Sequence, residues 1–365
     1  MQNVLFYYSS QQVHTGSPKV LARLIEGLDR THYAPYFIAS RTGDLSRRLA
    51  ANGTVILEGE VGQVSAATVF NNAANLFRLT RLLKRNKISL VHINQLGWNL
   101  DLAVAARLLS IPVVFHIHNH EQINLRNLDC RLGARYLFVS RALADQCGGY
   151  QVHPVKTQVL YNPIDIDRFR AGRSIRQELN LPQNIPVVGT VAQICHRKGI
   201  DIIVSCAEKV LASVPEAVFV IAGPDGLGEE RFARELRAEI AGKGLSEKIR
   251  LTGPRDDIED FMASLDLFFL PTRAEPFGMV FVEAMAAGVP VVASNVGGIP
   301  EIIPGEEYGI LLESESPLFP EVIVALLRDA DRRGRMAAAA FERARDNFSQ
   351  SIFNQKIGSL YRELI

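Results

Sequence analysis

Two glutamates stand eight residues apart around the start of a helical pattern, and their spacing suits them to binding a polyhydroxylated ligand. Glu275 precedes a glycine, Gly278, and Glu283 follows it. Apolar residues recur at helical spacing after the glycine, so a helix is expected over 278–287, with Glu283 about two turns in. Carboxylates accept hydrogen bonds from hydroxyl groups, so one glutamate can hold a sugar and the other a ribose.

The expected helix start adds an anion-binding feature. The backbone N–H groups of Gly278, Met279 and Val280 would have no acceptor within the helix. A helix N-terminus of this kind binds anions, phosphate above all. An anion site between two carboxylates predicts a nucleotide sugar as the ligand. The alternative interpretation is an ordinary strand–helix–strand unit with glutamates on its surface.

A longer pattern runs through this segment. Glu-x-Phe-Gly-x-x-x-x-Glu begins at Glu275 and is followed by Ala-x-Ala-x-Gly-x-Pro-Val-Val-Ala and by Gly-Gly-x-x-Glu, which ends at Glu301. The composite pattern resembles the retaining glycosyltransferases of family 4. The resemblance implies the GT-B fold, an α/β architecture of two Rossmann-like domains that face each other across a cleft. It also implies that Glu275 holds the donor sugar and that Glu283 holds the ribose.

A cationic segment follows the strand-like run 187–191. It resembles the Gly-Arg…Lys-Gly element of the family, in which the arginine and the lysine bind the donor diphosphate. Lys198 matches the lysine, but Gln193 stands at the position of the arginine. A neutral amide supplies no charge, so diphosphate binding is expected to depend more on Lys198. Arg197 either compensates or faces solvent.

The resemblance extends the donor-binding set to five further positions. Gly16 opens the first expected helix, where the lack of a side chain lets the backbone approach a ligand. Gly223, Pro254 and Arg255 follow two strand-like runs, and loops at these places border the nucleotide in the family. Phe277 completes the donor-binding set.

Three histidines alternate around the end of the run 113–117. His116, His118 and His120 would share one face of a strand, so a metal site is one interpretation. No carboxylate or thiolate lies at suitable spacing, and the resemblance instead places His118 against the donor sugar. His118 and Glu275 are therefore the expected catalytic residues, and His116 is expected to pack within the sheet.

A second metal-binding pattern is also assigned a structural role. Asp165 and Asp167 form an Asp-x-Asp, the signature with which another glycosyltransferase fold holds a divalent metal. The surrounding segment resembles the domain junction of family 4, so no essential metal and no other cofactor are expected. The polar stretch 165–184 is expected to link the two domains.

Strand-like and helical runs alternate along both halves of the chain, which predicts parallel sheets with helical crossovers. The expected domains are an N-terminal acceptor-binding domain over 1–168 and a C-terminal nucleotide-sugar-binding domain over 169–344. Residues 345–365 form an amphipathic helical pattern, and in the family this helix returns to the first domain. Ligands of such sheets bind at the carboxyl ends of the strands.

The charge is unevenly divided between the two halves. Residues 1–170 hold 19 Lys/Arg and 11 Asp/Glu, a balance of +8, and residues 171–365 hold 21 and 28, a balance of −7. A basic first half favours an anionic surface or substrate, and the basic amphipathic run 76–87 could dock onto anionic lipid. Complementary domains and an ordinary solvated helix face are the alternatives.

The four cysteines have no paired spacing, and no run approaches ~18 apolar residues. These features favour a cytoplasmic protein, with peripheral contact at the inner face of a membrane as a further expectation. No nucleic acid partner is expected.

These features together predict a retaining glycosyltransferase of polysaccharide or glycolipid biosynthesis. The donor would be a nucleoside diphosphate sugar, UDP-glucose or a close relative, and the acceptor a hydroxyl of a saccharide or a lipid-linked saccharide. The family is usually described by front-face attack, in which the leaving phosphate takes the acceptor proton. An epimerase or phosphorylase of the same fold is one alternative. A non-catalytic sugar-nucleotide-binding subunit or sensor is another alternative, and Gln193 is the only residue that favours it.

Overall fold

The computed structural model describes residues 1–11, 16–62, 69–95, 100–119, 129–147 and 154–365, which form two compact units. Unit 1 comprises Met1–Pro163 and Gln350–Ile365, and unit 2 comprises Ile164–Ser349. The units meet after residues 163 and 349. The sequence predicted domain borders after residues 168 and 344, so each prediction differs from the structure by five residues.

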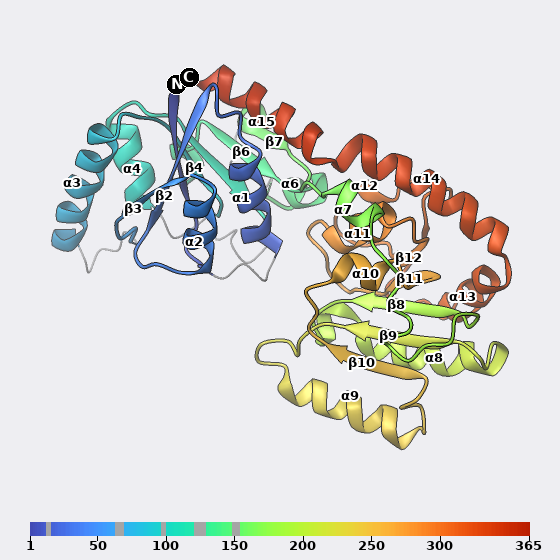
Figure 1. Cartoon of the computed structure of the whole chain (residues 1–365). Helices are drawn as coiled ribbons and strands as arrows, with labels where there is room; N and C mark the ends of the chain where they lie inside the picture. The colour runs from blue at the N-terminus through green and yellow to red at the C-terminus, as the bar shows by residue number, and fades with distance from the viewer. Residues whose placement is uncertain (12–15, 63–68, 96–99, 120–128, 148–153) are drawn as a thin grey trace. The chain divides into compact units, whose positions relative to one another are not determined.

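Unit 1 is built on a parallel sheet, several strands of which are labelled in Figure 1. Its described strands follow the order β3-β2-β1-β4-β5-β6-β7. The strands are β1 (Gln2–Tyr7), β2 (Tyr33–Ala39), β3 (Val55–Glu58), β4 (Ile88–Ile93), β5 (Val113–Ile117), β6 (Arg135–Phe138) and β7 (Thr157–Val159). The helices are α1 (Gly16–Glu26), α2 (Asp44–Ala51), α3 (Val69–Arg85), α4 (Leu100–Leu108), α5 (Asp129–Leu132), α6 (Arg141–Cys147) and α15 (Gln350–Leu364).

Unit 2 repeats this plan with the strand order β10-β9-β8-β11-β12-β13, again parallel throughout the described pairs. Its strands are β8 (Val187–Val191), β9 (Val218–Ala222), β10 (Ile249–Gly253), β11 (Leu267–Leu270), β12 (Val291–Ser294) and β13 (Ile310–Leu312). Its helices are α7 (Ile166–Arg170), α8 (Ile200–Ser213), α9 (Glu230–Gly242), α10 (Ile258–Met262), α11 (Met279–Ala286), α12 (Ile299–Ile302), α13 (Phe319–Arg328) and α14 (Ala330–Phe348).

The apolar runs of the sequence explain why both sheets are parallel. Parallel sheets carry helices on both faces, so their central strands are buried on both sides and read as continuous apolar segments. β9 is buried along its whole length, and so is β5. The helices contribute one apolar face each; in α1 the buried residues include Val20, Leu21, Leu24 and Ile25.

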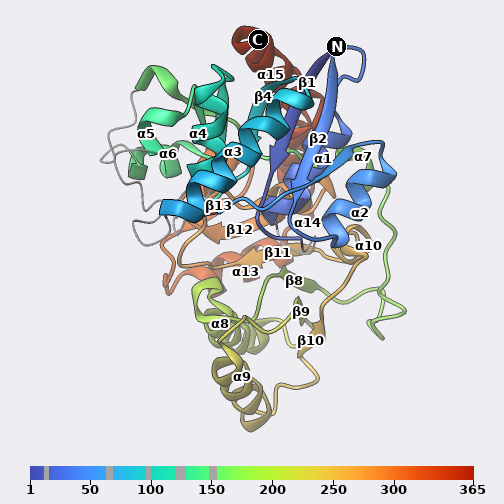
Figure 2. The same ribbon diagram turned by 90° about the vertical axis from the view of Figure 1, so that its left-hand side faces the viewer.

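α15 completes unit 1 although it comes last in the sequence. The Tyr361 ring packs edge-on against the Tyr33 ring at 5.6 Å, and the Tyr361 hydroxyl lies 2.8 Å from His92 Nδ1. The two chain termini consequently lie near each other in unit 1, as both views show (Figure 1, Figure 2).

The expectation of one helix over 345–365 is wrong. Its first residues belong to the end of α14, and Ser349 separates them from α15 with an extended backbone (φ −67°, ψ 154°). Ile164 forms a bridge with Ser349, and its N–H donates to the Phe348 carbonyl at 2.8 Å. This backbone pairing uses a carbonyl at the end of α14 and accompanies the break in the helix.

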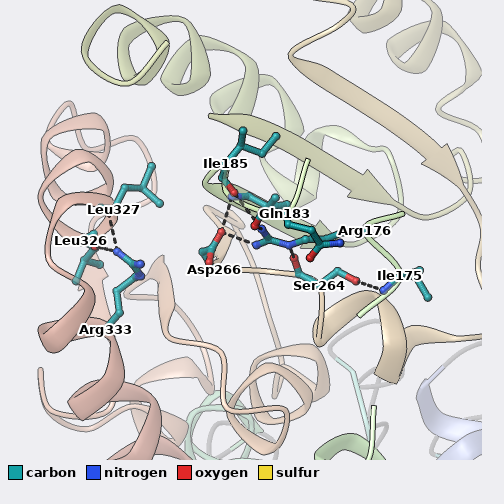
Figure 3. A network of polar contacts seen from close by, with 10 residues as sticks. Ile175, Arg176, Gln183, Ile185, Ser264, Asp266, Leu326, Leu327 and Arg333 are labelled. Carbon is teal, nitrogen blue, oxygen red and sulfur yellow. Dashed lines mark hydrogen bonds and ion pairs between the residues drawn. The ribbon is translucent and has the colours of Figure 1, made fainter. Parts of the chain in front are cut away.

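The expectation of a link over 165–184 is also wrong, because these residues are part of unit 2. Arg176 is the anchor, with only 9% of its surface exposed. Its guanidinium donates to the Ser264 carbonyl at 2.9 Å, to the Gln183 carbonyl at 2.7 Å and to the Asp266 carboxylate at 2.6 Å (Figure 3). One buried cation therefore holds the polar stretch against β11 and the start of β8.

Candidate functional site

The loops that leave β8 and β11 begin side by side in the middle of the unit 2 sheet. From β8 the chain continues to β9 on one side, and from β11 it continues to β12 on the other. Ligands of open parallel sheets bind at such a reversal of strand order, outside the carboxyl ends of the strands. Lys198 follows β8 and Glu275 follows β11, so both lie at this position.

Lys198 and Glu275 form an ion pair, with Lys198 Nζ 2.6 Å from Glu275 Oε2. The two side chains are only 14% and 11% exposed, so bulk salt screens the pair poorly. The structure thus brings together two predicted site residues that are far apart in the sequence. Lys198 can bind an anionic group of a ligand, and Glu275 can accept hydrogen bonds from its hydroxyl groups.

Backbone contacts fix the two loops against each other. The buried Thr272 hydroxyl lies 3.1 Å from both the Arg197 and the Ala274 carbonyl oxygens, and Arg273 N–H donates to the Arg197 carbonyl at 2.8 Å. The hydrogen bond that Arg273 donates to Asp201 at 2.7 Å raises the pKa of Arg273. The Arg197 guanidinium donates to the Ala274 carbonyl at 3.1 Å, so this side chain lies against the Glu275 loop.

Two glycines after β12 hold the backbone of Glu275. Gly298 N–H donates to the Glu275 carbonyl at 3.0 Å, and Gly297 has a φ of +54°. A Cβ on Gly297 would lie 1.9 Å from that same carbonyl oxygen, so no larger residue fits there. Gly297 and Gly298 were not among the expected site residues, although the Gly-Gly of the motif was the available signal.

α11 begins where the sequence predicts, directly after Gly278. Gly278 is the N-cap residue with a φ of +106°, a conformation that favours glycine. Met279 and Val280 form the first turn and are half-buried, with N–H groups that have no intrahelical acceptor. The Phe277 ring is buried and packs edge-on against Phe348 at 5.8 Å, so its side chain belongs to the core.

Glu283 lies in the second turn of α11 and is half-buried. Arg168 of α7 donates to both carboxylate oxygens of Glu259, at 2.9 and 2.8 Å, and this hydrogen bonding raises the Arg168 pKa. The negative charge of Glu283 contributes to the same increase in pKa. Glu283 therefore lies within electrostatic reach of a fixed arginine.

The loops after β8, β9 and β10 form one continuous edge. Ile194 N–H donates to the Pro224 carbonyl at 2.9 Å, and Gly223 N–H donates to the Gly253 carbonyl at 2.8 Å. Gln193 is exposed on the first of these loops. The structure therefore places Gln193 and Gly223 on neighbouring segments.

Pro254 and Arg255 continue this edge beyond β10. Pro254 is exposed. The Arg255 guanidinium is held by both oxygens of Asp257, at 2.8 and 2.5 Å, and this hydrogen bonding raises the Arg255 pKa. A nucleotide at this edge would meet an arginine that already has a carboxylate partner.

The reversal of strand order in unit 1 lies between β1 and β4, and the polar residues described there, such as Asn94, are uncharged. Asn94 follows β4; its Nδ2 donates to the Ser17 carbonyl at 3.1 Å, and its Oδ1 lies 3.0 Å from His118 Nε2. With the amide nitrogen committed to Ser17, Oδ1 must accept, so His118 carries its proton on Nε2. Gly16 is the exposed first residue of α1, beside Ser17.

Asn94 was not predicted. Its signal is its place as the first polar residue after the buried run of β4. The neighbouring Ser9 completes the arrangement, because its N–H and its hydroxyl both donate to Gln95 Oε1, at 3.0 and 2.7 Å. The described residues at the β1/β4 reversal therefore present neutral hydrogen-bonding groups.

His92, His116 and His118 form a buried cluster beneath these groups. Successive ring centroids are 5.5 and 4.2 Å apart. Burial lowers the pKa of His92 and of His118 to about 3, and burial also lowers the pKa of His116. All three rings are therefore neutral at pH 7, and His118 acts as a hydrogen-bonding group rather than as a cation. His120 lies outside the described residues.

Asp165 of the Asp-x-Asp motif caps a helix. Its carboxylate accepts a hydrogen bond from the Arg168 N–H at 3.1 Å, at the N-terminus of α7. Across the described residues, no group of three or more His, Cys, Asp or Glu side chains is placed to hold a metal ion. In the same residues no helix is both long and apolar enough to cross a membrane.

Comparison with known proteins matches each unit to a glycosyltransferase family model. The family model described as Glycosyl transferases group 1 matches residues 172–343, and the model described as Glycosyltransferase Family 4 matches residues 14–168. The chain is 31% identical over 233 residues to a D-inositol 3-phosphate glycosyltransferase of Corynebacterium efficiens. This match covers 60% of the chain and 54% of that relative.

The chain is also 30% identical to the lipopolysaccharide core biosynthesis mannosyltransferase LpsB of Rhizobium meliloti. That match covers 58% of the chain and 62% of the relative, so the chain spans less than two thirds of both relatives. Among solved structures, HepE of Anabaena in complex with UDP and glucose superposes with a TM-score of 0.84 at 24% identity, and the match covers all of both chains. A glycosyltransferase from Rickettsia africae superposes with a TM-score of 0.87 at 18% identity, covering 100% and 98% of the two chains. These likenesses establish the fold.

Proposed function

Since the chain belongs to the family 4 glycosyltransferases and has their GT-B fold, we propose that it is a retaining glycosyltransferase that uses a nucleoside diphosphate sugar. Unit 2 would bind the donor and unit 1 the acceptor. The product would belong to polysaccharide or glycolipid biosynthesis.

The Lys198–Glu275 pair at the β8/β11 reversal is the observation that supports this proposal most. A diphosphate would replace Glu275 as the partner of Lys198, and the released carboxylate would accept hydrogen bonds from the donor sugar. The N–H groups of Met279 and Val280 at the start of α11 would meet the same phosphates. These groups would also stabilise the negative charge of the departing diphosphate. Glu283, one helical turn further, would hold the ribose.

UDP-glucose is the proposed donor. The named activities of the relatives leave the sugar open, because one is a mannosyltransferase. HepE has been solved with UDP-glucose and with UDP and glucose, which favours a uridine nucleotide in a site of this fold. The proposed acceptor is a hydroxyl of a saccharide or of a lipid-linked saccharide.

His118 is proposed to steady the donor sugar from unit 1. Its Nδ1 is buried, and its Nε2 lies 3.0 Å from Asn94 Oδ1, so the neutral ring would act by holding Asn94 in place at the sugar. It would not supply a proton to the leaving group. That proton would move from the acceptor hydroxyl to the leaving phosphate, as in front-face attack.

A titration of the purified protein with UDP-, GDP- and ADP-sugars tests the donor assignment. One nucleotide class should bind at micromolar concentration, and Glu283→Ala should abolish this binding. Glu306→Ala removes an exposed glutamate of unit 2 and serves as the matched control. No binding by any donor to folded protein would overturn the proposal.

Gln193 favours one second candidate, a sugar-nucleotide-binding subunit without activity. Its exposed amide stands where the family has a charged arginine, so binding without turnover is chemically reasonable. Turnover separates the two functions: release of the nucleoside diphosphate, with the product's anomeric configuration retained by NMR, supports the transferase. Tight binding without release over many hours supports the subunit.

Activity without an essential metal is part of the proposal. Lys198 supplies a fixed positive charge for the diphosphate, and Asp165 is already used as a helix cap. Turnover after exhaustive treatment with a chelator should equal that of untreated protein. A loss that Mg²⁺ or Mn²⁺ restores would contradict this.

Peripheral membrane contact is proposed for α3 of unit 1. Phe77 is 71% exposed, and Arg78, Arg81, Lys84 and Arg85 are exposed around it. Within the described residues these four cations have no ion-pair partner in the protein. An exposed aromatic ring among unpaired cations is suited to the surface of an anionic bilayer. Such contact would bring the enzyme to a lipid-linked acceptor.

A further inference from the structure

Unit 1 contains a cavity of about 280 Å³ at the carboxyl ends of β1, β2 and β3. Tyr7, Tyr8 and Ser9 line it after β1, Ser40 lines it after β2, and 59–62 line it after β3. The cavity thus lies at the edge of the sheet where ligands of open parallel sheets bind. Its lining residues belong to unit 1, whereas the donor residues on the loops after β8, β9, β10 and β11 belong to unit 2.

The polar groups of this cavity are neutral or negative. Glu60 is the single charged side chain among the described residues that line it. Glu60 and Ser40 are both exposed, and neither has a hydrogen-bond or ion-pair partner in the described part of the protein. Burial raises the pKa of Tyr7 to about 12, with Asp101 adding to the effect, so its hydroxyl stays protonated.

The wall that carries Glu60 is held in place by a buried carboxylate. Asp101 accepts a hydrogen bond from the Gly62 N–H at 2.8 Å and another from the Leu102 N–H at 2.7 Å. Asn75 of α3 donates to the same carboxylate. The segment after β3 is therefore tied to the start of α4, and the cavity is a built feature of the fold.

These groups are complementary to sugar hydroxyls. A carboxylate without a partner accepts hydrogen bonds from one or two hydroxyls, and such charge-assisted bonds are the strong ones. The Tyr8 ring offers an apolar face with a polar tip, and pockets of this mixed character fix small polar ligands. A phosphate group in the same place would meet the like charge of Glu60, which is unfavourable at short range.

We propose that this cavity binds the acceptor, and that the acceptor is an uncharged saccharide rather than a phosphorylated one. Glu60 is the residue that sets this preference. The inference rests on the proposed function, because it needs an enzyme with a second substrate. It adds the acceptor's chemical class, which the donor site does not determine.

The test uses the full chain saturated with a non-transferable phosphonate analogue of the donor that the titration above selects, so that the donor-sugar position is filled. Glucose, galactose and mannose are compared with their 6-phosphates by ligand-observed NMR. At least one neutral sugar should bind about tenfold more tightly than its phosphate. Glu60→Gln should weaken the neutral sugar's binding by about tenfold, and Glu60→Arg should reverse the preference, a change that misfolding cannot produce.

Glu58→Gln is the matched control, since Glu58 is exposed on β3 two positions away and does not line the cavity. Its sugar binding should equal that of the wild type. Equal or tighter binding of the phosphates would overturn the proposal, as would neutral binding that Glu60→Gln leaves intact, or the absence of all sugar binding. If no nucleotide sugar binds, the proposed function fails by itself, and the same comparison on the free protein still tests the cavity.

Discussion

The two units have the same sheet architecture, but charged side chains mark the strand-order reversal of unit 2 and neutral side chains that of unit 1. Each has a parallel sheet whose strand order reverses once, between β1 and β4 in unit 1 and between β8 and β11 in unit 2. In unit 2 the reversal carries the Lys198–Glu275 ion pair. In unit 1 it carries Asn94 bonded to His118 and Ser9 bonded to Gln95, all uncharged at pH 7.

We infer from this difference that the fold determines where a ligand binds and that the residues at the strand ends determine its chemistry. Ligands of open parallel sheets bind at such reversals, outside the carboxyl ends of the strands. Fixed charge at one of them suits a diphosphate, whereas neutral donors and acceptors at the other suit hydroxyl groups. A family with one fold can therefore pair one donor chemistry with many acceptors.

Acidification is expected to have the largest effect on stability. The buried histidines of unit 1 do not bind protons near neutral pH while the protein is folded. Their pKa values are lowered on folding from about 6.5, to about 3 for His92 and His118, so the unfolded chain binds the protons first. Stability is complete above pH 6.5 and is lost as pH falls towards 3. For three such rings, the free energy of unfolding should decrease by roughly 4 kcal/mol between pH 7.5 and 5.5.

Urea unfolding at the two pH values measures this loss. His116→Phe removes one of the three titrating rings and should therefore remove about a third of the pH dependence. A phenylalanine suits this position because the Phe353 ring stacks against the His116 ring at 6.5 Å. His196→Gln, which changes an exposed histidine of unit 2 outside the cluster, serves as the control. Asp101 opposes the trend, because burial raises its pKa. An unfolding free energy that is flat over this range would show that the cluster is not held neutral.

Removal of the charge from the unit 2 reversal should affect catalysis most. Lys198→Ala takes away the cation proposed for the diphosphate, and kcat/KM should fall by about 10²-fold, as for the loss of one preorganised charge-stabilising group. Lys209→Ala, an exposed lysine on α8, is the control and should retain full activity. Since Glu275 loses its partner in the variant, a thermal melt must accompany the kinetics. Unchanged kcat/KM in folded Lys198→Ala protein would contradict the assignment.

Charge reversal on α3 tests whether the basic character of unit 1 serves a surface rather than the acceptor. Arg81→Glu combined with Lys84→Glu should reduce sedimentation with anionic lipid vesicles by about tenfold or more, given about 1 kcal/mol for each cation near the bilayer. Arg234→Glu with Arg335→Glu makes the same change in net charge on unit 2 and should leave binding unaltered. Equal losses in the two variants would indicate a response to net charge alone.

The smallest effect is expected from restoring charge at position 193. Gln193→Arg adds an exposed cation to the loop after β8, so UDP should bind about threefold more tightly, within the range of exposed ion pairs. Gln177→Arg, an exposed change elsewhere in unit 2, provides the comparison. Weaker UDP binding by Gln193→Arg would indicate that the amide itself contacts the nucleotide.

The family, the fold class and the helix after Gly278 could be predicted from the sequence, because each depends on local pattern. The helix over 278–287 is confirmed, with its ends at Met279 and Ala286. The Lys198–Glu275 contact could not be predicted, since it depends on β8 lying beside β11, and strand order is not written in local periodicity.

The two wrong expectations have the same physical origin. The amphipathic pattern of 345–365 continues through Ser349, and the break accompanies a backbone bridge from the distant Ile164. The polar composition of 165–184 suggested a link, but Arg176 is buried through contacts with Ser264 and Asp266, which lie about 90 residues later. Asn94 was missed for a similar reason, because its partners Ser17 and His118 come from two other elements.

Hydrogen–deuterium exchange of the full chain with and without saturating UDP tests the central claim most directly, since it reports on both reversals in one experiment. The account predicts slower exchange over 193–201 and 273–283 in unit 2, and unchanged exchange over 5–11 and 88–95 in unit 1. Protection confined to the unit 1 segments, or no protection over 273–283 at saturation, would contradict the assignment of the charged reversal to the diphosphate.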